Sequence, residues 1–296
     1  MSNQANRARD GEAAGAAAGA PTLRVAALQM VSGANVSDNL ARAEALIGQA
    51  AAAGARLVAL PEYFVLLGRS DRDKLAIREH DGDGPIQSFL SGQAAAHGIW
   101  LVGGTVPLAS RDPGKVLNST LVYGPEGRRV ARYDKIHLFG YDNGTGRYDE
   151  AAPIVPGATP TVFDLEQPAG AGQVPAHWRV GLTVCYDLRF PELYRALAPV
   201  DLVVVPSAFT YTTGSAHWEV LARARAIENQ CYLLAPAQGG RHENGRRTWG
   251  HSMLVDPWGE VVAVRAEGEG VVLGDVERAR LRSVRSGLPA LSHRVM

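Results

Sequence analysis

The chain has 296 residues, 46% of them hydrophobic, which is enough for one large core or two at most. Its formal net charge is zero at pH 7, so a broad basic surface for nucleic acid is not indicated. The two cysteines, Cys185 and Cys231, are too few for a disulfide framework and favour a reducing compartment, the cytoplasm. No apolar run approaches the roughly 20 residues that span a bilayer, so we expect no membrane segment.

Residues 1–21 are rich in Ala and Gly and poor in large apolar side chains. They lack the basic stretch followed by an apolar stretch that marks a secretory signal. We expect a disordered extension there. No Pro/Gly/Ser-rich linker divides residues 22–296, which are therefore predicted to form one domain.

The first half of the chain alternates between apolar strand-like runs and helical stretches. Strands are predicted at 23–30, 56–60, 98–103, 119–123 and 130–133, and helices at 39–53 and 85–97. Residues 140–160 are rich in Gly, Asp and Pro, and we expect irregular structure there.

The second half repeats the alternation. A strand runs into Cys185 and a helix starts at Pro191. Further strands are predicted at 202–206, 231–235, 251–256, 260–266 and 271–275, and a helix at about 216–229. The segment from Val276 onward is basic and has no apolar periodicity. Strands alternating with helices indicate an α/β protein, and turn signals at 124–127 and 257–259 indicate that its sheet is mixed.

Cys185 is placed where the apolar strand changes into a polar, helix-compatible stretch. Backbone N–H groups at a helix start have no partner in the helix, and they favour a thiolate and later an oxyanion. A lone cysteine in a strand is often only a small core residue, so a catalytic role needs partner groups elsewhere.

Two such groups follow predicted strands. Glu62 comes after the strand at 56–60, and Lys135 comes after the strand at 130–133. Ligands of open α/β sheets bind at the carboxyl ends of strands, although each residue taken alone could be an ordinary surface charge. With Cys185 they supply the parts of amide hydrolysis: a nucleophile, a base that later protonates the leaving nitrogen, and a cation for the oxyanion.

The segments 61–62, 134–138 and 185–192 resemble, in this order, the three catalytic segments of the nitrilase superfamily, the carbon–nitrogen hydrolases. The resemblance covers about residues 22–290. It implies a single-domain α-β-β-α sandwich, a homodimer and a Glu62–Lys135–Cys185 triad. Glu150 matches the family's additional glutamate, which would hold the lysine and help to place water, while Lys135 and the Tyr186 N–H would bind the oxyanion. The resemblance implies no cofactor, and the histidines lack zinc-ligand spacing, so we expect no metal.

The segments 207–219, 223–242 and 250–259 resemble the Nit branch of this superfamily, amidases that act on α-keto acid amides. They look closer to the type that hydrolyses deaminated glutathione than to ω-amidase, which takes 2-oxoglutaramate or 2-oxosuccinamate. Both remain open, as does a non-catalytic binding protein; a true nitrilase is disfavoured. Phe209, Thr212 and Thr213 are candidates to bind a substrate carboxylate, although Thr213 or Ser215 could simply cap a helix. The loop 139–149 departs from the pattern and is expected to shape the pocket mouth.

Overall fold

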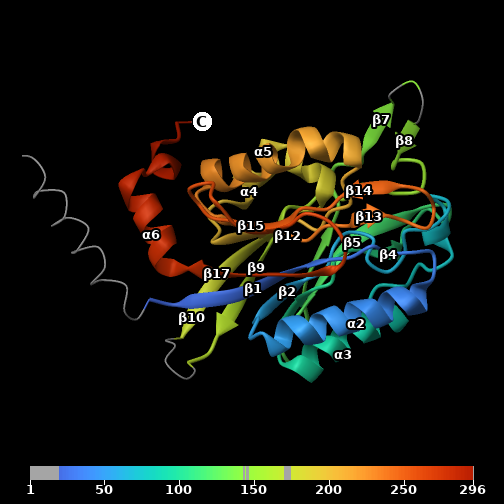
Figure 1. Cartoon of the computed structure of the whole chain (residues 1–296), viewed down its shortest axis with the longest axis horizontal. Coiled ribbons are helices and arrows are strands. Elements are labelled where there is room, and N and C mark those ends of the chain that lie inside the picture. The colour runs from blue at the N-terminus through green and yellow to red at the C-terminus, as the bar shows by residue number, and fades with distance from the viewer. Residues whose placement is uncertain (1–19, 143, 145–146, 170–174, 296) are drawn as a thin grey trace, which may run out of the picture.

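The computed structural model of the protein describes residues 20–142, 144, 147–169 and 175–295 (Figure 1). The predicted α-β-β-α sandwich is confirmed. Two mixed sheets face each other, with α2 (Val36–Ala52) and α3 (Pro85–His97) covering one sheet and α4 (Pro191–Leu197) and α5 (Tyr211–Asn229) covering the other. None of the helices in the described part of the chain is long and apolar enough to cross a membrane.

The first sheet has seven strands in the order β17-β1-β2-β3-β5-β4, with β6 paired to β5. Its strands are β1 (Thr22–Gln29), β2 (Leu57–Ala59), β3 (Trp100–Val102), β4 (Val106–Ala109), β5 (Val116–Tyr123), β6 (Arg129–Asp134) and β17 (Gly270–Glu277). The second sheet has the order β16-β15-β12-β11-β10-β9. Its strands are β9 (Thr161–Gln167), β10 (Ala176–Leu182), β11 (Leu202–Val204), β12 (Tyr232–Ala235), β15 (Ser252–Val255) and β16 (Val261–Arg265).

The centre of each sheet is parallel. In the first sheet β1, β2 and β3 run parallel, and in the second sheet β10, β11 and β12 do so. These strands are short apolar runs, as expected where both faces are buried. Glu62 follows β2, while Cys185 follows β10, so both candidate residues lie just beyond the carboxyl ends of parallel strands.

Two buried clusters hold the layers together. One lies between the sheets and includes Val25 of β1, Val180 of β10 and Leu202 of β11. The other packs α2 and α3 against the first sheet, through residues such as Leu46 and Leu90. Because the first cluster draws side chains from both sheets, the sheets share one core and fix each other's position.

The predicted strands at 23–30, 56–60, 98–103, 119–123, 130–133, 202–206, 231–235, 251–256, 260–266 and 271–275 are all present within a few residues. The helix predicted at 85–97 has the bounds of α3, between Pro85 at its first position and Gly98 in the left-handed conformation at its end.

Three expectations were wrong, and two of them concern segments expected to lack regular structure. Residues 140–160 are not wholly irregular, because β7 (Gly140–Asp142) and β8 (Arg147–Asp149) form a hairpin. The segment from Val276 continues β17 and then forms α6 (Arg278–Gly287), which buries only Leu281 and Val284 and therefore shows too narrow an apolar stripe to be recognised. A second hairpin, β13 (Gly239–Arg241) with β14 (Arg247–Trp249), was not predicted.

The third wrong expectation concerns the start of α5. The helix begins at Tyr211, and not near residue 216, because the Thr210 hydroxyl accepts a hydrogen bond from the Thr213 N–H at 3.3 Å. Thr210 is therefore the N-cap, and neither Thr213 nor Ser215 has that role. Thr213 is placed in the first turn of the helix instead.

Candidate active site

Cys185 opens a short 3-10 turn, η2 (Cys185–Arg189), that connects β10 to α4. The sequence predicted the helix from Pro191 but not this intervening turn. The Cys185 N–H donates to the Pro206 carbonyl at 2.9 Å, which ties the turn to the end of β11. Cys185 has φ of 50°, a left-handed conformation that costs energy in a residue with a Cβ. Such backbone strain persists where the surroundings enforce it, and it is common at functional sites.

Glu62 is held by a tight turn after β2. The next residue, Tyr63, also has positive φ, at 55°, and its N–H donates to the Thr105 hydroxyl at 2.9 Å. Gly104 lies so close that a Cβ there would be 2.2 Å from the Pro61 carbonyl oxygen. The turn therefore requires a glycine opposite it, and the side chain of Glu62 is directed into the interior, where it is 1% exposed.

Lys135 follows β6 and is fully buried. Its backbone N–H donates to the Asn118 carbonyl at 3.0 Å, and its carbonyl accepts from the Gly157 N–H at 2.8 Å. A Cβ at Gly157 would lie 2.1 Å from the Asp134 carbonyl oxygen. These contacts fix the backbone on both sides of the lysine, so that its long side chain reaches the centre of the site.

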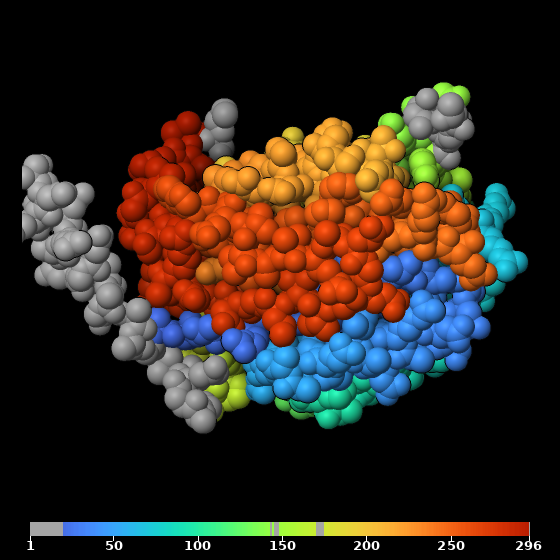
Figure 2. Space-filling view, in the orientation of Figure 1, coloured from blue at the N-terminus to red at the C-terminus, as the bar shows by residue number. Residues whose placement is uncertain are grey.

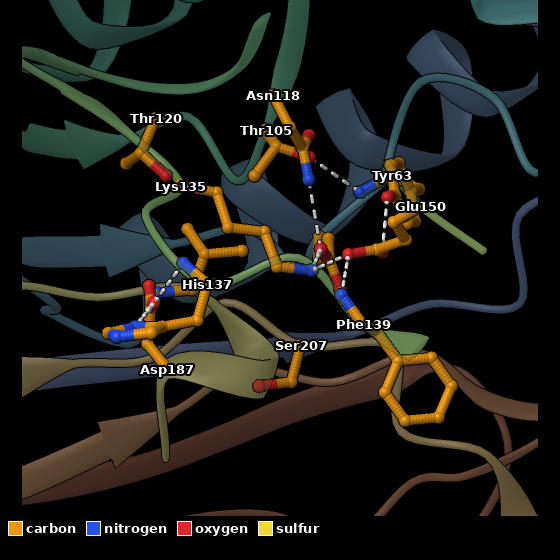
Figure 3. Close-up of polar contacts among 12 residues, drawn as sticks. Tyr63, Thr105, Asn118, Thr120, Lys135, His137, Phe139, Glu150, Asp187 and Ser207 are labelled. Atoms are coloured by element: carbon orange, nitrogen blue, oxygen red, sulfur yellow. Dashed lines mark hydrogen bonds and ion pairs between the residues drawn. The ribbon is translucent and has the colours of Figure 1, made fainter. Parts of the chain in front are cut away.

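The Lys135 ammonium contacts both candidate carboxylates, and Figure 3 shows it pointing toward Glu150. Lys135 Nζ lies 2.9 Å from Glu62 Oε1 and 2.6 Å from Glu150 Oε2. The Asn118 side-chain amide also donates to Glu62 Oε1, at 2.9 Å. The structure thus brings together one cation and two carboxylates in the interior, where such groups interact more strongly than in water.

Glu150 is anchored from two further directions. The Tyr63 hydroxyl donates to Glu150 Oε1 at 2.8 Å, and the Phe139 N–H donates to Glu150 Oε2 at 2.8 Å. Since charge-assisted hydrogen bonds favour the ionised form of their acceptor, Glu150 is held as a carboxylate beside the lysine.

The pKa directions distinguish the two carboxylates. Burial raises the pKa of Glu62, with repulsion from Glu150 adding to the effect, and attraction to Lys135 only partly offsets this rise. Burial acts on Glu150 in the same direction, but Lys135 and the Phe139 N–H lower its pKa overall. Burial would lower the pKa of Lys135, yet Glu150 and Glu62 raise it well above its usual value. The arrangement is that of a fixed ion pair, Lys135–Glu150, beside a more basic carboxylate, Glu62.

Cys185 shares the cavity with this carboxylate, because Cys185, Glu62 and Ala208 all line it. The charges of Cys185 and Glu62 influence each other across it. Burial, followed by the negative charge of Glu62, raises the pKa of Cys185 well above the usual thiol value. The raised pKa disfavours a free thiolate, and the carboxylate of Glu62, which lines the same cavity, is the nearby group that can accept the thiol proton.

The Tyr186 N–H, the second candidate oxyanion donor, lies in the first turn of η2, where backbone N–H groups have no acceptor within the element. It is adjacent to Cys185 in the chain, on the same turn. Because an oxyanion forms within bonding distance of the attacking sulfur, this position suits a donor to it.

A cavity opens over Cys185, with about 890 Å³ of space including the part open to solvent. Glu62, Glu150 and Tyr186 also line it. No group of three or more His, Cys, Asp or Glu side chains among the described residues is arranged to hold a metal ion.

Only two of the three residues predicted to bind a substrate carboxylate lie at the cavity. Phe209 and Thr213 line the cavity, together with Thr210, whereas Thr212 is exposed on α5 and does not line it. The β7–β8 segment contributes Phe139 and Tyr148 to the wall. The prediction that the 139–149 loop shapes the pocket therefore agrees with its position.

Asp187 is a residue of the site that the sequence reasoning missed. Its buried carboxylate accepts from the Val184 N–H at 2.8 Å, the Tyr133 hydroxyl at 2.7 Å and the His137 N–H at 3.0 Å, and it lies 2.7 Å from His137 Nδ1 (Figure 3). It joins the cysteine turn to the lysine segment. In the sequence, only its position two residues after Cys185 pointed to Asp187. That position did not indicate which groups would bind its carboxylate.

Four basic side chains in the cavity wall were also missed: Lys74, Arg189, Arg246 and Arg247. Only Arg189 belongs to a segment that the sequence motifs single out. The other three come from η1 (Asp73–Leu75) and from the β13–β14 hairpin. Folding alone brings these elements to the cavity.

Comparisons with known proteins agree with this geometry. A model of the family described as carbon-nitrogen hydrolase matches residues 24–286. A deaminated glutathione amidase from Yersinia enterocolitica is 42% identical over 274 residues, which cover 91% of this chain and 92% of that one. The human omega-amidase is 37% identical over 273 residues, covering 90% and 93%.

A solved structure shows the same relationship in three dimensions. Saccharomyces cerevisiae Nit3, described as a member of branch 10 of the nitrilase superfamily, superimposes with a TM-score of 0.80 at 29% identity, covering 93% of this chain and 97% of that one. Because the family model spans most of the sequence and close relatives match nearly end to end, the chain belongs to the carbon–nitrogen hydrolase family.

Proposed function

We propose that the protein is an amidase that hydrolyses the amide bond of a small carboxylate-bearing substrate through a cysteine thioester. The observation that carries this proposal is that Cys185 lines the same cavity as buried Glu62, whose carboxylate lies 2.9 Å from the Lys135 ammonium. A nucleophile and a base that line one cavity, with a buried cation bound to the base, are the groups that acyl transfer requires.

The first half of the reaction follows from these contacts. Glu62 takes the proton of the Cys185 thiol, and the sulfur attacks the amide carbonyl carbon. Lys135 and the Tyr186 N–H bind the oxygen on which negative charge develops. The carbon–nitrogen bond then breaks as Glu62 gives its proton to the leaving nitrogen, and an acyl thioester and a free amine or ammonia result.

The second half releases the acid. Glu62, again a carboxylate, takes a proton from a water molecule that attacks the thioester carbonyl, and Glu150 helps to place this water. The sulfur leaves and recovers the proton from Glu62, which restores the thiol. No atom or electron is needed from any group outside the substrate, water and these side chains.

Deaminated glutathione is the substrate that we propose first. The relative from Yersinia enterocolitica with that name is 42% identical, against 37% for human omega-amidase. The alternative is ω-amidase activity on 2-oxoglutaramate or 2-oxosuccinamate, by the same chemistry. A non-catalytic binding protein on this fold is a further alternative, which the complete set of Glu62, Lys135 and Cys185 disfavours.

The test is the release of amine or ammonia from deaminated glutathione, 2-oxoglutaramate, a simple aliphatic amide and a nitrile. We expect kcat/KM to be highest for deaminated glutathione, since this ratio measures discrimination between substrates. Cys185→Ala is expected to abolish turnover while keeping the circular dichroism spectrum. Turnover by that variant would refute the mechanism, and a preference for 2-oxoglutaramate would assign the protein to the ω-amidases.

We also propose a homodimer that works in the reducing cytoplasm. Both cysteines are free thiols. Five exposed apolar side chains lie on α5, on the turn that Arg223 of α5 binds, and on β16, which follows this turn. The orange surface of α5 runs along the upper part of Figure 2. This α5–β16 patch consists of Val220 and Ile227 on α5, Trp258 in the adjoining turn, and Val262 and Val264 on β16, which are 47–69% exposed. Exposed apolar groups that cluster in this way are typical of association surfaces.

A further inference from the structure

The four cations of the cavity wall fall into two pairs. Arg246 lies 2.7 Å from Asp71, and Arg247 lies 3.3 Å from Glu267. For Lys74 and Arg189, by contrast, no described residue places a carboxylate within ion-pair distance. Two of the four positive charges are thus already neutralised, and two are available to a ligand.

Lys74 comes from η1, in the segment that follows β2 of the first sheet. Its ammonium lies 4.3 Å from the centre of the Tyr63 ring, and the Tyr63 hydroxyl binds Glu150. Burial lowers the pKa of Lys74, and Glu150 and Asp71 attract it only from beyond ion-pair distance. The Lys74 ammonium is partly desolvated, lies over an aromatic ring and has no carboxylate partner among the described residues. A bound anion would therefore stabilise its charge.

Arg189 comes from η2, which follows β10 of the second sheet. It ends η2, four residues after Cys185, and its guanidinium lies 5.6 Å from the Phe209 ring centre and 5.9 Å from that of Tyr186. Within the described part of the chain, its side chain forms one hydrogen bond, to His217 Nδ1 at 3.2 Å. The guanidinium fork is therefore largely available for bidentate binding of a carboxylate.

Cys185 lines the same cavity as these two cations. We infer that Lys74 and Arg189 each bind one carboxylate of a substrate that carries a carboxylate on both sides of the scissile amide. The inference rests on the proposed amidase function and deepens it. Deaminated glutathione has this form, with a 2-oxo acid carboxylate on the acyl side and a glycine carboxylate on the leaving side. An ω-amide such as 2-oxoglutaramate has only the first.

The experiment uses four amides of one series: with both carboxylates, with the acyl-side one only, with the leaving-side one only, and with neither. Each missing carboxylate is replaced by a hydroxymethyl group, which is uncharged and is not cleaved by amide hydrolysis. kcat/KM is measured for the wild type, Lys74→Met and Arg189→Met. In each variant, the ratio of kcat/KM between amides with and without one of the carboxylates is expected to fall about 10- to 100-fold. This fall corresponds to the loss of one charged hydrogen bond. The two variants should affect different carboxylates.

Arg246→Met is the matched control, because Arg246 lines the same cavity but already has Asp71 as its partner. It should leave the carboxylate preference within about threefold of the wild type. The inference is overturned if Lys74→Met or Arg189→Met lowers kcat/KM equally for all four amides, which is the result of a merely structural role. It is also overturned if both act on the same carboxylate.

A binding measurement separates this inference from the proposed function. If the wild type turns over none of the four amides, the proposed function fails, but glutarate can still be tested for protection of Cys185 against alkylation. The two carboxylate sites are supported if glutarate protects Cys185 and butyrate does not. The affinity of glutarate should then be about tenfold or more weaker in both variants. Absence of protection, or equal protection in all variants, would overturn them.

Discussion

At the scale of single residues, Glu62 shows how burial sets chemistry. Its carboxylate is 1% exposed, and burial raises its pKa although Lys135 lies 2.9 Å away. A carboxyl group with a raised pKa is a stronger base and is closer to the working pH, which suits proton transfer from a thiol and to a leaving amine. Glu150, although buried in the same cluster, has a lowered pKa and remains the partner of the lysine.

This difference predicts a pH profile. In the proposed mechanism the ionised form of Glu62 is the base. Because the pKa of Glu62 is raised, kcat/KM should fall as pH drops through a midpoint above the usual glutamate value of 4.5. Glu62→Gln cannot accept the proton and should lower kcat by about 10²- to 10⁴-fold. The measurement is the pH dependence of kcat/KM from pH 4 to 8 for the wild type, together with kcat of the variant at pH 7.

Thiol reactivity provides the control for that prediction. Alkylation of Cys185 should be slower in Glu62→Gln, because the thiol then has no base beside it, whereas the unfolding temperature should remain near that of the wild type. An acid limb at or below pH 4.5, or a variant with wild-type kcat, would show that Glu62 is not the base.

At the scale of elements, Asp187 connects two segments that are about 50 residues apart in the chain. The turn η2 and the segment after β6 both depend on its carboxylate, which accepts from Val184, Tyr133 and His137. Asp187→Asn replaces one acceptor oxygen by an amide that faces these N–H and O–H donors. We expect a loss of about 1–3 kcal/mol in the free energy of unfolding, and a fall in kcat larger than the rise in KM, because Cys185 and Lys135 lose their common support.

Asp256 offers a matched comparison for this variant. It is also a buried aspartate that holds a turn, accepting from the Trp258 and Glu260 N–H groups and from Arg280, but it does not line the cavity. Asp256→Asn should cost similar stability, measured by denaturant unfolding, without a comparable loss of kcat. Equal losses of kcat in both variants would mean that Asp187 acts only through overall stability.

At the scale of the whole molecule, the sequence predicted the features that depend on residues close together in the chain. The helix bounds of α3 follow from Pro85 and Gly98, and the order of the Glu62, Lys135 and Cys185 segments along the chain was enough to indicate the family. The β7–β8 hairpin could not be predicted, because its Gly- and Asp-rich sequence has no strand pattern. Lys74 could not be assigned to the site either, since it comes from a short turn that only the packed fold brings beside Tyr63.

The proposed dimer is a prediction about the assembled molecule. The α5–β16 patch presents Val220 and Ile227 on one helix, and burying such side chains contributes about 1.5–3 kcal/mol each. The double variant Val220→Glu, Ile227→Glu would bury two unpaired charges and should weaken association by at least about a hundredfold. Sedimentation velocity should show twice the mass of one chain for the wild type and one chain for the variant. Val130→Glu, at an exposed valine on β6 outside the patch, should remain dimeric. A monomeric wild type, or a double variant that sediments as a dimer, would exclude this face as the interface.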